Sequence, residues 1–141
     1  KTAYEISLGL VGSEMCIRDR YKTNLTKEEI AIEYAYSNIA IVSSLYEGFG
    51  FPVGEAMACS IPLIATNVAS IPEITSNFAE LIPQKDPKSI EQAIRKIFLN
   101  PSKYQIRADE GRMHIIENFD WQKIAKQYEN LIYQTVEKFK C

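Results

Sequence analysis

The spacing of apolar and polar positions predicts a regular alternation of helices and strands along most of this chain. Thr26-Lys27-Glu28-Glu29 has the form of a capping box, and it predicts a helix that begins there and ends near Ser37. The next segment, 39–42, is a short and continuously apolar run that predicts a strand. Because this run does not alternate, we expect the strand to be buried on both faces, as in a parallel sheet.

A second helix and strand follow the same pattern. A glycine-rich turn leads into a predicted helix over about Val53 to Cys59, and the apolar segment 61–65 predicts the next strand. The proline in that segment lies near the strand start, where a missing N–H is tolerated. A loop through Asn67 and Pro72 then leads to a short apolar segment at 79–82.

Three helices are predicted for the rest of the chain, each begun by a residue that favours the N-cap position. These N-cap residues are Asp86, Asn100 and Asp120, and a proline follows each of the first two. The second of the three helices is expected to end near Asn118, and the third carries an apolar stripe from Trp121 onward. Strands that alternate with helices predict an α/β domain with a parallel sheet.

The segment 46–58, Tyr-Glu-Gly-Phe-Gly-Phe-Pro-Val-Gly-Glu-Ala-Met-Ala, is the strongest candidate for a binding site. Ligands of parallel α/β sheets bind beyond the carboxyl ends of strands, which is where Glu47, Gly48, Gly50 and Glu55 are expected. Glycines let backbone N–H groups approach a ligand, and a helix N-terminus stabilises a phosphate. Carboxylates accept hydrogen bonds from hydroxyl groups. The combination suits a sugar nucleotide.

The same residues also have simpler interpretations. A glutamate in a first helical turn is favoured by the helix dipole, and a Gly-Phe-Gly sequence forms tight turns without any ligand. Two other functions use the same residues. Glu47 and Glu55 could be the acid and nucleophile of a glycoside hydrolase. Alternatively, the chain could be a non-catalytic nucleotide-binding α/β module.

The N-terminal segment is expected to be foreign to the fold. Residues 9–20, Gly-Leu-Val-Gly-Ser-Glu-Met-Cys-Ile-Arg-Asp-Arg, resemble a translated sequencing adapter, and residues 1–20 are therefore not expected to be part of the fold. The natural segment is expected to run over 21–141, which is 141 − 20 = 121 residues, and to belong to a protein that is longer at its N-terminus. This length fits one domain or part of a larger one.

Composition narrows the classes of partner and compartment. The net charge is −2 and no basic stripe is present, so nucleic acid is not an expected partner. No apolar run approaches the roughly 20 residues that span a bilayer. The cysteines have neither metal-site nor disulfide spacing, so Cys59 is expected in the core and the protein in a reducing cytoplasm. His114, the single histidine, is expected at the surface.

The spacing of Glu47 and Glu55 resembles the E-x7-E motif of the retaining glycosyltransferases of family 4, which have the GT-B architecture. The resemblance extends from about Lys27 to Tyr133. Other segments that are similar to landmarks of that family are Ala35–Ala40, Ser43–Gly50, Glu55–Cys59, Ile71–Ile74 and Phe119–Trp121. The resemblance implies a Rossmann-like parallel sheet with flanking helices, the C-terminal part of a GT-B nucleotide-sugar-binding domain.

The resemblance also implies a role for each site residue. Glu55 would bind the ribose hydroxyls of a UDP-, GDP- or ADP-sugar, and Glu47 would act at the donor sugar as the catalytic residue. Gly48, Phe49 and Gly50 would offer backbone N–H groups to the sugar and the diphosphate. Transfer would retain the anomeric configuration and would need no metal or other cofactor.

Family properties further imply that the acceptor, a glycan, lipid or small molecule, is bound by an N-terminal domain absent from this chain. We therefore expect the chain alone to be inactive. The parent protein would be cytoplasmic and could associate with the inner face of the membrane. Part of the apolar face of the last helix is expected to be exposed.

Two departures from the family pattern concern backbone conformation. Ser60 stands where glycine is common before a strand, so the turn there is expected to be slightly strained. Val68-Ala69-Ser70 replaces a loop of the pocket that is often rich in glycine in the family.

Overall fold

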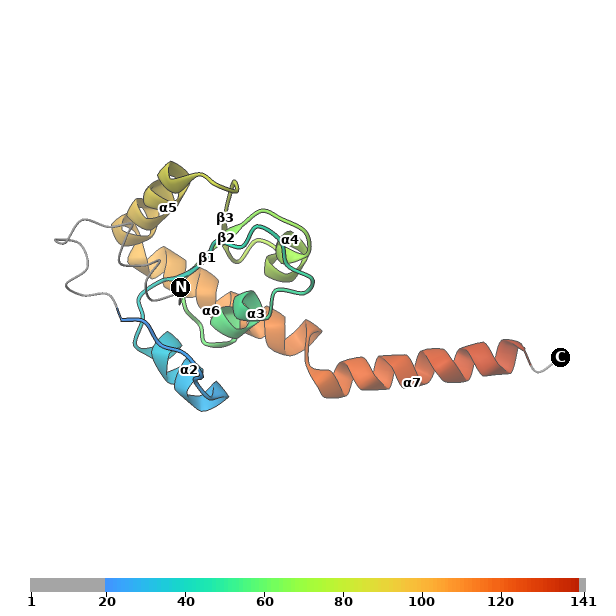
Figure 1. Cartoon of the computed structure of the whole chain (residues 1–141). Helices are drawn as coiled ribbons and strands as arrows, with labels where there is room; N and C mark the ends of the chain where they lie inside the picture. Colours follow the sequence, from blue (N-terminus) through green and yellow to red (C-terminus); the bar gives the residue numbers. More distant parts are fainter. Residues whose placement is uncertain (1–19, 140–141) are drawn as a thin grey trace, which may run out of the picture.

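Three short strands form one parallel sheet in the order β1-β2-β3 (Figure 1). In this computed structural model, which describes residues 20–139, the strands are β1 (Ala40–Val42), β2 (Leu63–Thr66) and β3 (Glu80–Ile82). Ala40 pairs with Leu63, and Ile64 pairs with Glu80. Helices separate the strands along the chain, so the predicted α/β fold with a parallel sheet is confirmed. Apart from Arg20, the adapter-like segment 9–20 lies outside the described residues.

The central strand, and not the first one, is the fully buried strand of this sheet. All four residues of β2 are buried, whereas Ile41 of β1 is 45% exposed. The prediction that 39–42 is buried on both faces is therefore wrong for this chain. The physical reason is that β1 lies at one edge of the described sheet and pairs only with β2. A continuously apolar sequence allows a strand to be buried on both faces, but it does not determine whether other elements of the fold cover those faces.

The first two helices follow the local signals closely. Helix α2 (Lys27–Ala35) has the full capping box, in which Thr26 and Glu29 exchange hydrogen bonds of 2.8 and 3.2 Å. Helix α3 (Phe51–Ala58) begins two residues earlier than predicted, because Gly50 takes the N-cap position in a left-handed conformation. Val53, Ala56 and Met57 form the buried side of α3.

A short helix, α4 (Ile71–Thr75), occupies part of what the sequence predicts as a loop. Five residues are too few to give a helical period in the sequence. Pro72 lies in its first turn, and Ile71 and Ile74 are buried against the core. Burial of these two side chains stabilises a helix that its own hydrogen bonds could not maintain.

The three predicted C-terminal helices are α5 (Pro87–Leu99), α6 (Pro101–Asn118) and α7 (Trp121–Lys138). Asp86 and Asp120 cap α5 and α7 as predicted, each accepting two backbone N–H bonds. Asn100 occupies the N-cap of α6 but makes no side-chain capping bond. Instead, its Nδ2 donates to the Lys96 carbonyl at 3.4 Å, so here the amide ends the preceding helix.

Two apolar clusters lie on the two faces of the sheet. The larger joins β2 to α3 and α4, and it contains Val53, Ala56, Met57, Leu63, Ala65, Ile71 and Ile74. The smaller joins the sheet to α5, and it contains Ile64, Ile82, Ala93 and Ile97. Because side chains alternate along a strand, Leu63 and Ala65 face one cluster while Ile64 faces the other. The result is a sheet covered by helices on both faces.

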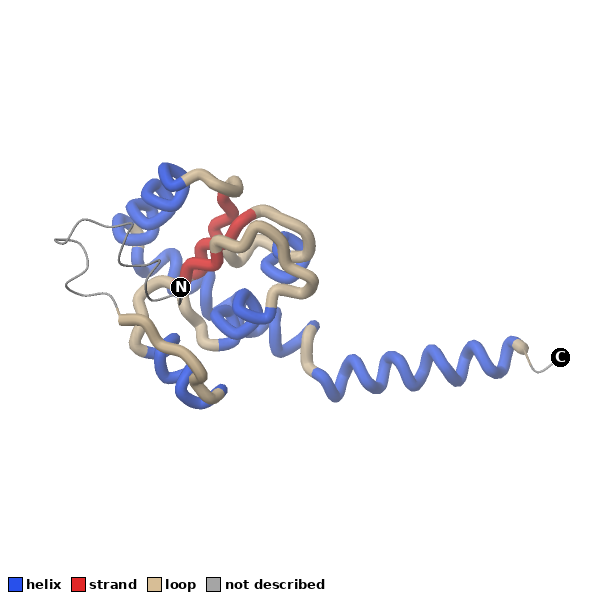
Figure 2. The backbone as a smooth tube through the Cα atoms, in the orientation of Figure 1, coloured by secondary structure: helices blue, strands red, loops and turns tan. Residues whose placement is uncertain are grey.

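The last helix, α7, extends away from the rest of the chain (Figures 1 and 2). None of its residues is buried. Its exposed apolar side chains are Trp121, Tyr128, Leu131, Ile132, Tyr133 and Val136. The expectation that part of this apolar face is exposed is therefore confirmed. Within the described residues, no helix combines the length and apolarity needed to cross a membrane.

Candidate functional site

The segment 43–50 connects the carboxyl end of β1 to the N-terminus of α3, as the sequence predicts. Its last residue, Gly50, has φ = 84° and ψ = 49°, which is the left-handed region. The Gly50 carbonyl accepts hydrogen bonds from the N–H groups of Val53 (2.9 Å) and Gly54 (3.2 Å). A residue with a Cβ would be strained in this conformation, so the fold itself requires glycine at position 50.

Gly48 differs from Gly50, because nothing in the fold requires a glycine there. Gly50 is the only glycine with a positive φ among the described residues, so Gly48 does not use the conformational freedom of a glycine. A Cβ built on Gly48 would meet no heavy atom within 4 Å. Position 48 therefore leaves open space at the carboxyl edge of the sheet, and that space is available to a ligand.

Glu47 is half-buried and is held at one end of its carboxylate. The Ser44 hydroxyl donates to Glu47 Oε1 at 2.6 Å, and the Ser70 hydroxyl lies 3.4 Å from the Glu47 carbonyl oxygen. No hydrogen bond from another described residue reaches Glu47 Oε2. One carboxylate oxygen is thus fixed by the protein, while the other keeps its full capacity to accept hydrogen bonds.

Two further side chains hold the backbone of this turn, and the sequence analysis missed both. The hydroxyl of Thr66, at the end of β2, donates to the Ser44 carbonyl at 2.6 Å. Gln84, which follows β3, donates through Nε2 to the Leu45 carbonyl at 2.7 Å. Both residues lie at or beyond a strand's carboxyl end, and a polar residue in that position was the available signal. All three strands therefore contribute to the geometry of the turn.

Glu55 is exposed on α3, one turn beyond the helix start. Its carboxylate accepts no hydrogen bond from the described residues, so both oxygens are available. The neighbouring Tyr34 of α2 donates through its hydroxyl to the Pro52 carbonyl at 3.3 Å. Burial, and secondarily the negative charge of Glu55, raises the pKa of Tyr34, so the phenol stays protonated and keeps this bond.

Among the described residues, Glu55 lines two cavities, and Glu47 lines neither of them. The larger, of about 460 Å³, lies between α3, the end of α6 and the start of α7. Its lining is Phe49, Phe51, Gly54, Glu55, Ala58, Ile115, Phe119, Trp121 and Ile124. The smaller, of about 200 Å³, lies between α2 and α3. The structure thus brings Phe49 together with Glu55 in one cavity, whereas Glu47 lies in the adjoining turn.

Phe49 belongs to a row of aromatic rings that runs through Phe119 and His114 to Phe78. Its ring centroid is 5.8 Å from that of Phe119, which is 5.8 Å from His114, and His114 is 5.3 Å from Phe78. His114 is half-buried, and its Nε2 is buried without a hydrogen-bond partner among the described residues. The expectation of a surface histidine is therefore wrong. The polar helical sequence around His114 does not reveal that these rings cover it.

Ser60 and Ala69, which stand where the family often has glycine, both have left-handed backbone conformations. Ser60 has φ = 54° and Ala69 has φ = 45°. The strain predicted for Ser60 is therefore confirmed. Ala69 precedes Ser70, the residue whose hydroxyl approaches the Glu47 carbonyl, so the strained loop also supports the candidate site. A left-handed alanine costs about 1–2 kcal/mol relative to a right-handed one.

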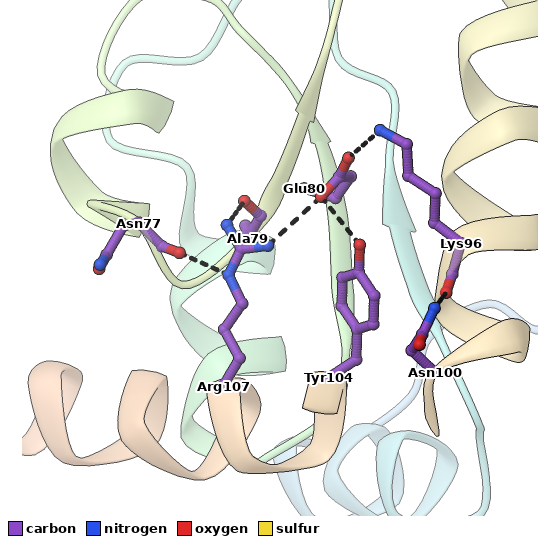
Figure 3. Close-up of polar contacts among 7 residues, drawn as sticks. All are labelled: Asn77, Ala79, Glu80, Lys96, Asn100, Tyr104 and Arg107. Atoms are coloured by element: carbon purple, nitrogen blue, oxygen red, sulfur yellow. Dashed lines mark hydrogen bonds and ion pairs between the residues drawn. The ribbon is translucent and has the colours of Figure 1, made fainter. Parts of the chain in front are cut away.

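A second polar cluster joins β3 to α5 and α6 (Figure 3). Glu80 accepts hydrogen bonds from Lys96 (2.7 Å), Tyr104 (3.3 Å) and Arg107 (3.3 Å). Arg107 also donates to the Ala79 carbonyl at 2.6 Å and to the Asn77 carbonyl. Burial alone would raise the pKa of Glu80, but its hydrogen bonds and ion pairs with Lys96 and Arg107 lower it overall. Both carboxylate oxygens are occupied, so this cluster is structural.

No group of three or more His, Cys, Asp or Glu side chains within residues 20–139 is arranged to hold a metal ion. Cys59 is half-buried at the C-cap of α3, and burial raises the pKa of its thiol. A protonated thiol is a poor nucleophile. The expectation that the reaction needs no metal stays a prediction.

Known proteins resemble this chain over most of its length. It is similar to the MMP alpha-(1->4)-mannosyltransferase of Mycolicibacterium hassiacum, with 32% identity over 120 residues, which cover 82% of this chain and 29% of that protein. It is also similar to the O-antigen chain mannosyltransferase B of Escherichia coli, with 29% identity over 86% of this chain and 30% of that protein. The chain therefore spans about 30% of the length of these curated relatives.

A solved structure gives the same relation in three dimensions. The sucrose-phosphate synthase of Thermosynechococcus elongatus matches with a TM-score of 0.76 and 29% identity, over 84% of this chain and 30% of that one. This match confirms the expected Rossmann-like sheet with flanking helices, part of a GT-B domain. The family model for "Glycosyl transferases group 1" matches residues 20–118, well over half of the sequence. The chain therefore belongs to the group 1 glycosyl transferases.

Proposed function

We propose that this chain is the donor-binding part of a retaining glycosyltransferase, which transfers a sugar from a nucleotide-sugar donor to an acceptor. The observation that carries the proposal is the turn at the carboxyl edge of the sheet. There the Glu47 carboxylate is fixed at one oxygen and free at the other, beside open space at Gly48 and the N-terminus of α3. Membership of the group 1 family supports transferase chemistry.

Within this proposal, Glu55 accepts hydrogen bonds from the two ribose hydroxyls of the donor. Its carboxylate is exposed, accepts no bond from the described residues, and lies one turn from the start of α3. A hydrogen bond to a charged group contributes about 1.5–3 kcal/mol, so a carboxylate that accepts two of them can change affinity by orders of magnitude.

The donor diphosphate and sugar belong, in this proposal, at the turn 47–50. We propose that the backbone N–H groups of Gly48, Phe49 and Gly50 donate to the negatively charged diphosphate, to which the α3 dipole adds partial positive charge. Glu47 contacts the donor sugar as the catalytic residue. The bond from the anomeric carbon to phosphate breaks while the acceptor oxygen bonds on the same face, and the acceptor proton passes to the leaving phosphate.

The two alternative functions receive less support. An acid and nucleophile pair would have to face one substrate, but Glu47 lines neither of the cavities that contain Glu55. A non-catalytic nucleotide-binding module would share the fold, but the similarity to two mannosyltransferases favours a transferase. We therefore place the chain in an enzyme.

The remaining properties are also proposals. The donor is a UDP-, GDP- or ADP-sugar, no metal takes part, and the whole protein is cytoplasmic or bound to the inner face of the membrane. The acceptor is a glycan, lipid or small molecule bound by a further domain. Because the chain spans about 30% of its relatives, we expect the isolated 141-residue chain not to catalyse transfer. Turnover by the purified chain would refute this expectation.

Calorimetric titration of the chain with UDP, GDP and ADP tests the proposal. We expect one nucleotide to bind and Glu55→Gln to weaken its binding at least tenfold. Glu91→Gln is the matched control, because Glu91 is also an exposed helical glutamate but lies on α5. Failure of all three nucleotides to bind the folded chain, or an equal loss in the two variants, would contradict the assigned site.

A further inference from the structure

Two hydroxyl groups, those of Thr66 and Ser44, donate the hydrogen bonds that hold the turn that carries Glu47. We call Thr66, Ser44 and Glu47 together the hydroxyl relay. Thr66 Oγ1 donates to the Ser44 carbonyl at 2.6 Å, and Ser44 Oγ donates to Glu47 Oε1 at 2.6 Å. Both distances are at the short end for O–H···O hydrogen bonds. The relay runs from the last residue of β2 to the carboxylate at the candidate site.

Each hydroxyl of the relay has a defined direction. A hydroxyl has one hydrogen, so Ser44, once it donates to Glu47, has no second donor bond to make. Thr66 is 2% exposed, and a buried hydroxyl that lost its acceptor would be left unsatisfied. The Ser44 carbonyl therefore stays beside Thr66, and the Ser44 side chain stays beside Glu47.

The relay leaves Glu47 with one free oxygen and a fixed side chain. A glutamate that is free to rotate loses conformational entropy when it binds a ligand, whereas one that is already ordered does not. Ser70 and Gln84 hold the Glu47 and Leu45 carbonyls of the same turn, so the backbone below the relay is fixed as well. This is the arrangement of a preorganised binding group.

We propose that Ser44 and Thr66 are positioning residues, which hold the Glu47 carboxylate in the rotamer that accepts a hydroxyl group of the donor sugar. This inference rests on the proposed function for the identity of the ligand. It assigns to the relay the recognition of the sugar moiety, and not of the nucleotide.

The first test needs no ligand. Three-bond NMR couplings of the Glu47 side chain report whether it has one χ1 rotamer or several. We expect one rotamer in the unmodified chain and in Thr66→Ser, which keeps the hydroxyl. We expect averaged couplings in Ser44→Ala and in Thr66→Val, which lacks the hydroxyl at nearly unchanged volume.

Thr75→Val is the matched control, because Thr75 is also a buried threonine whose hydroxyl bonds to a carbonyl, that of Ile71 at 2.9 Å. It should lower stability as Thr66→Val does but leave the Glu47 couplings unchanged. If Thr66→Val does not fold, Ser44→Ala and Thr66→Ser decide the question. Averaged couplings in the unmodified chain, or unchanged couplings in Ser44→Ala, would overturn the proposal.

The second test separates the sugar from the nucleotide. Affinities are measured for the nucleoside diphosphate that binds and for its hexose conjugate, for example UDP and UDP-glucose. We expect Ser44→Ala to weaken the conjugate about tenfold and the nucleotide less than twofold, and we expect no further loss in a Glu47→Ala background. Equal losses for the two ligands would contradict the positioning role.

The two proposals fail in different ways. If no nucleotide binds, the proposed function fails, while the Glu47 couplings still decide whether the relay fixes the carboxylate. If nucleotides bind in a Glu55-dependent way and Ser44→Ala has no selective effect on the hexose conjugate, the function stands and the inference is wrong.

Discussion

Glu80 and Glu47 are both glutamates next to the sheet, and their carboxylates are used in opposite ways. Glu80 has partners on both oxygens, from Lys96, Tyr104 and Arg107. Glu47 has one partner, Ser44, on one oxygen. A carboxylate that has hydrogen-bond partners from the protein on both oxygens stabilises the fold and has little capacity left for a ligand. A carboxylate that is held in place but left partly unsatisfied is ready to bind something else.

The largest expected effect concerns the polar cluster around Glu80. Arg107→Met removes the bonds to Glu80, to the Ala79 carbonyl and to the Asn77 carbonyl, so we expect a loss of about 3 kcal/mol in the free energy of unfolding. Urea unfolding measures it. Arg95→Met is the control, because Arg95 makes an exposed ion pair with Glu91 within α5. This substitution should lower the free energy of unfolding by less than about 0.5 kcal/mol. Similar losses of stability in the two variants would contradict the structural role assigned to the Glu80 cluster.

The second prediction concerns pH. The pKa of Glu80 is lowered in the folded chain, so its contribution is complete above the unfolded pKa and is lost as the pH falls through the folded pKa. We expect Glu80→Gln to cost about 2 kcal/mol at neutral pH, because hydrogen bonds to a charged acceptor are replaced by weaker ones.

That difference should shrink as the pH falls below about 4.5, the ordinary value for a glutamate, and it should vanish once Glu80 itself is protonated. Thermal unfolding of both proteins between pH 7 and pH 3 measures this convergence. A difference that stays constant over the whole range would mean that packing, and not charge, accounts for the role of Glu80.

The third prediction separates the two glycines of the turn. Gly50→Ala should lower the free energy of unfolding by about 1–2 kcal/mol, because alanine is strained at φ = 84°. Gly48→Ala should change it by less than about 0.5 kcal/mol, since a Cβ there meets no atom. Nucleotide-sugar affinity should fall in both variants. If Gly48→Ala binds the donor normally, the open space at position 48 is not part of the site.

The smallest expected effect is a gain in stability. Ala69→Gly relieves a left-handed alanine but adds backbone entropy to the unfolded chain, so a net gain of about 0.5 kcal/mol is expected. The same substitution at Ala31, in the middle of α2, should instead cost about 1 kcal/mol. Opposite signs for these two substitutions in denaturant unfolding would confirm that the loop before Ser70 is strained.

Local signals in the sequence were sufficient for most of the fold. The capping residues Thr26, Asp86 and Asp120 begin helices as predicted, since a cap acts over three or four residues that are adjacent in the chain. The strands and the carboxyl-edge position of the glycine turn also follow from local patterns. What the sequence did not reveal was burial, as at Ile41 and His114, because burial depends on segments that are distant in the chain.

The same limit applies to the site. Glu47, Gly50 and Glu55 stood out because residue type and spacing suggest their chemistry directly. Thr66 and Gln84 did not, because their partners lie 22 and 39 residues away. Helix α4 was missed because two buried isoleucines, and not a helical period, stabilise it. Positioning residues of a site are thus harder to predict from a sequence than the residues that touch its ligand.

The fluorescence of Trp121 can report on the cavity between α3 and α7. It is the only tryptophan of the chain, it is 75% exposed, and it lines this cavity together with Phe49 and Glu55. Its indole therefore emits from a largely aqueous environment, and a molecule or protein segment that covers the indole with apolar groups will shift that emission to shorter wavelengths. The protein carries its own fluorescent reporter, so occupancy of the space beside Glu55 can be followed without a label.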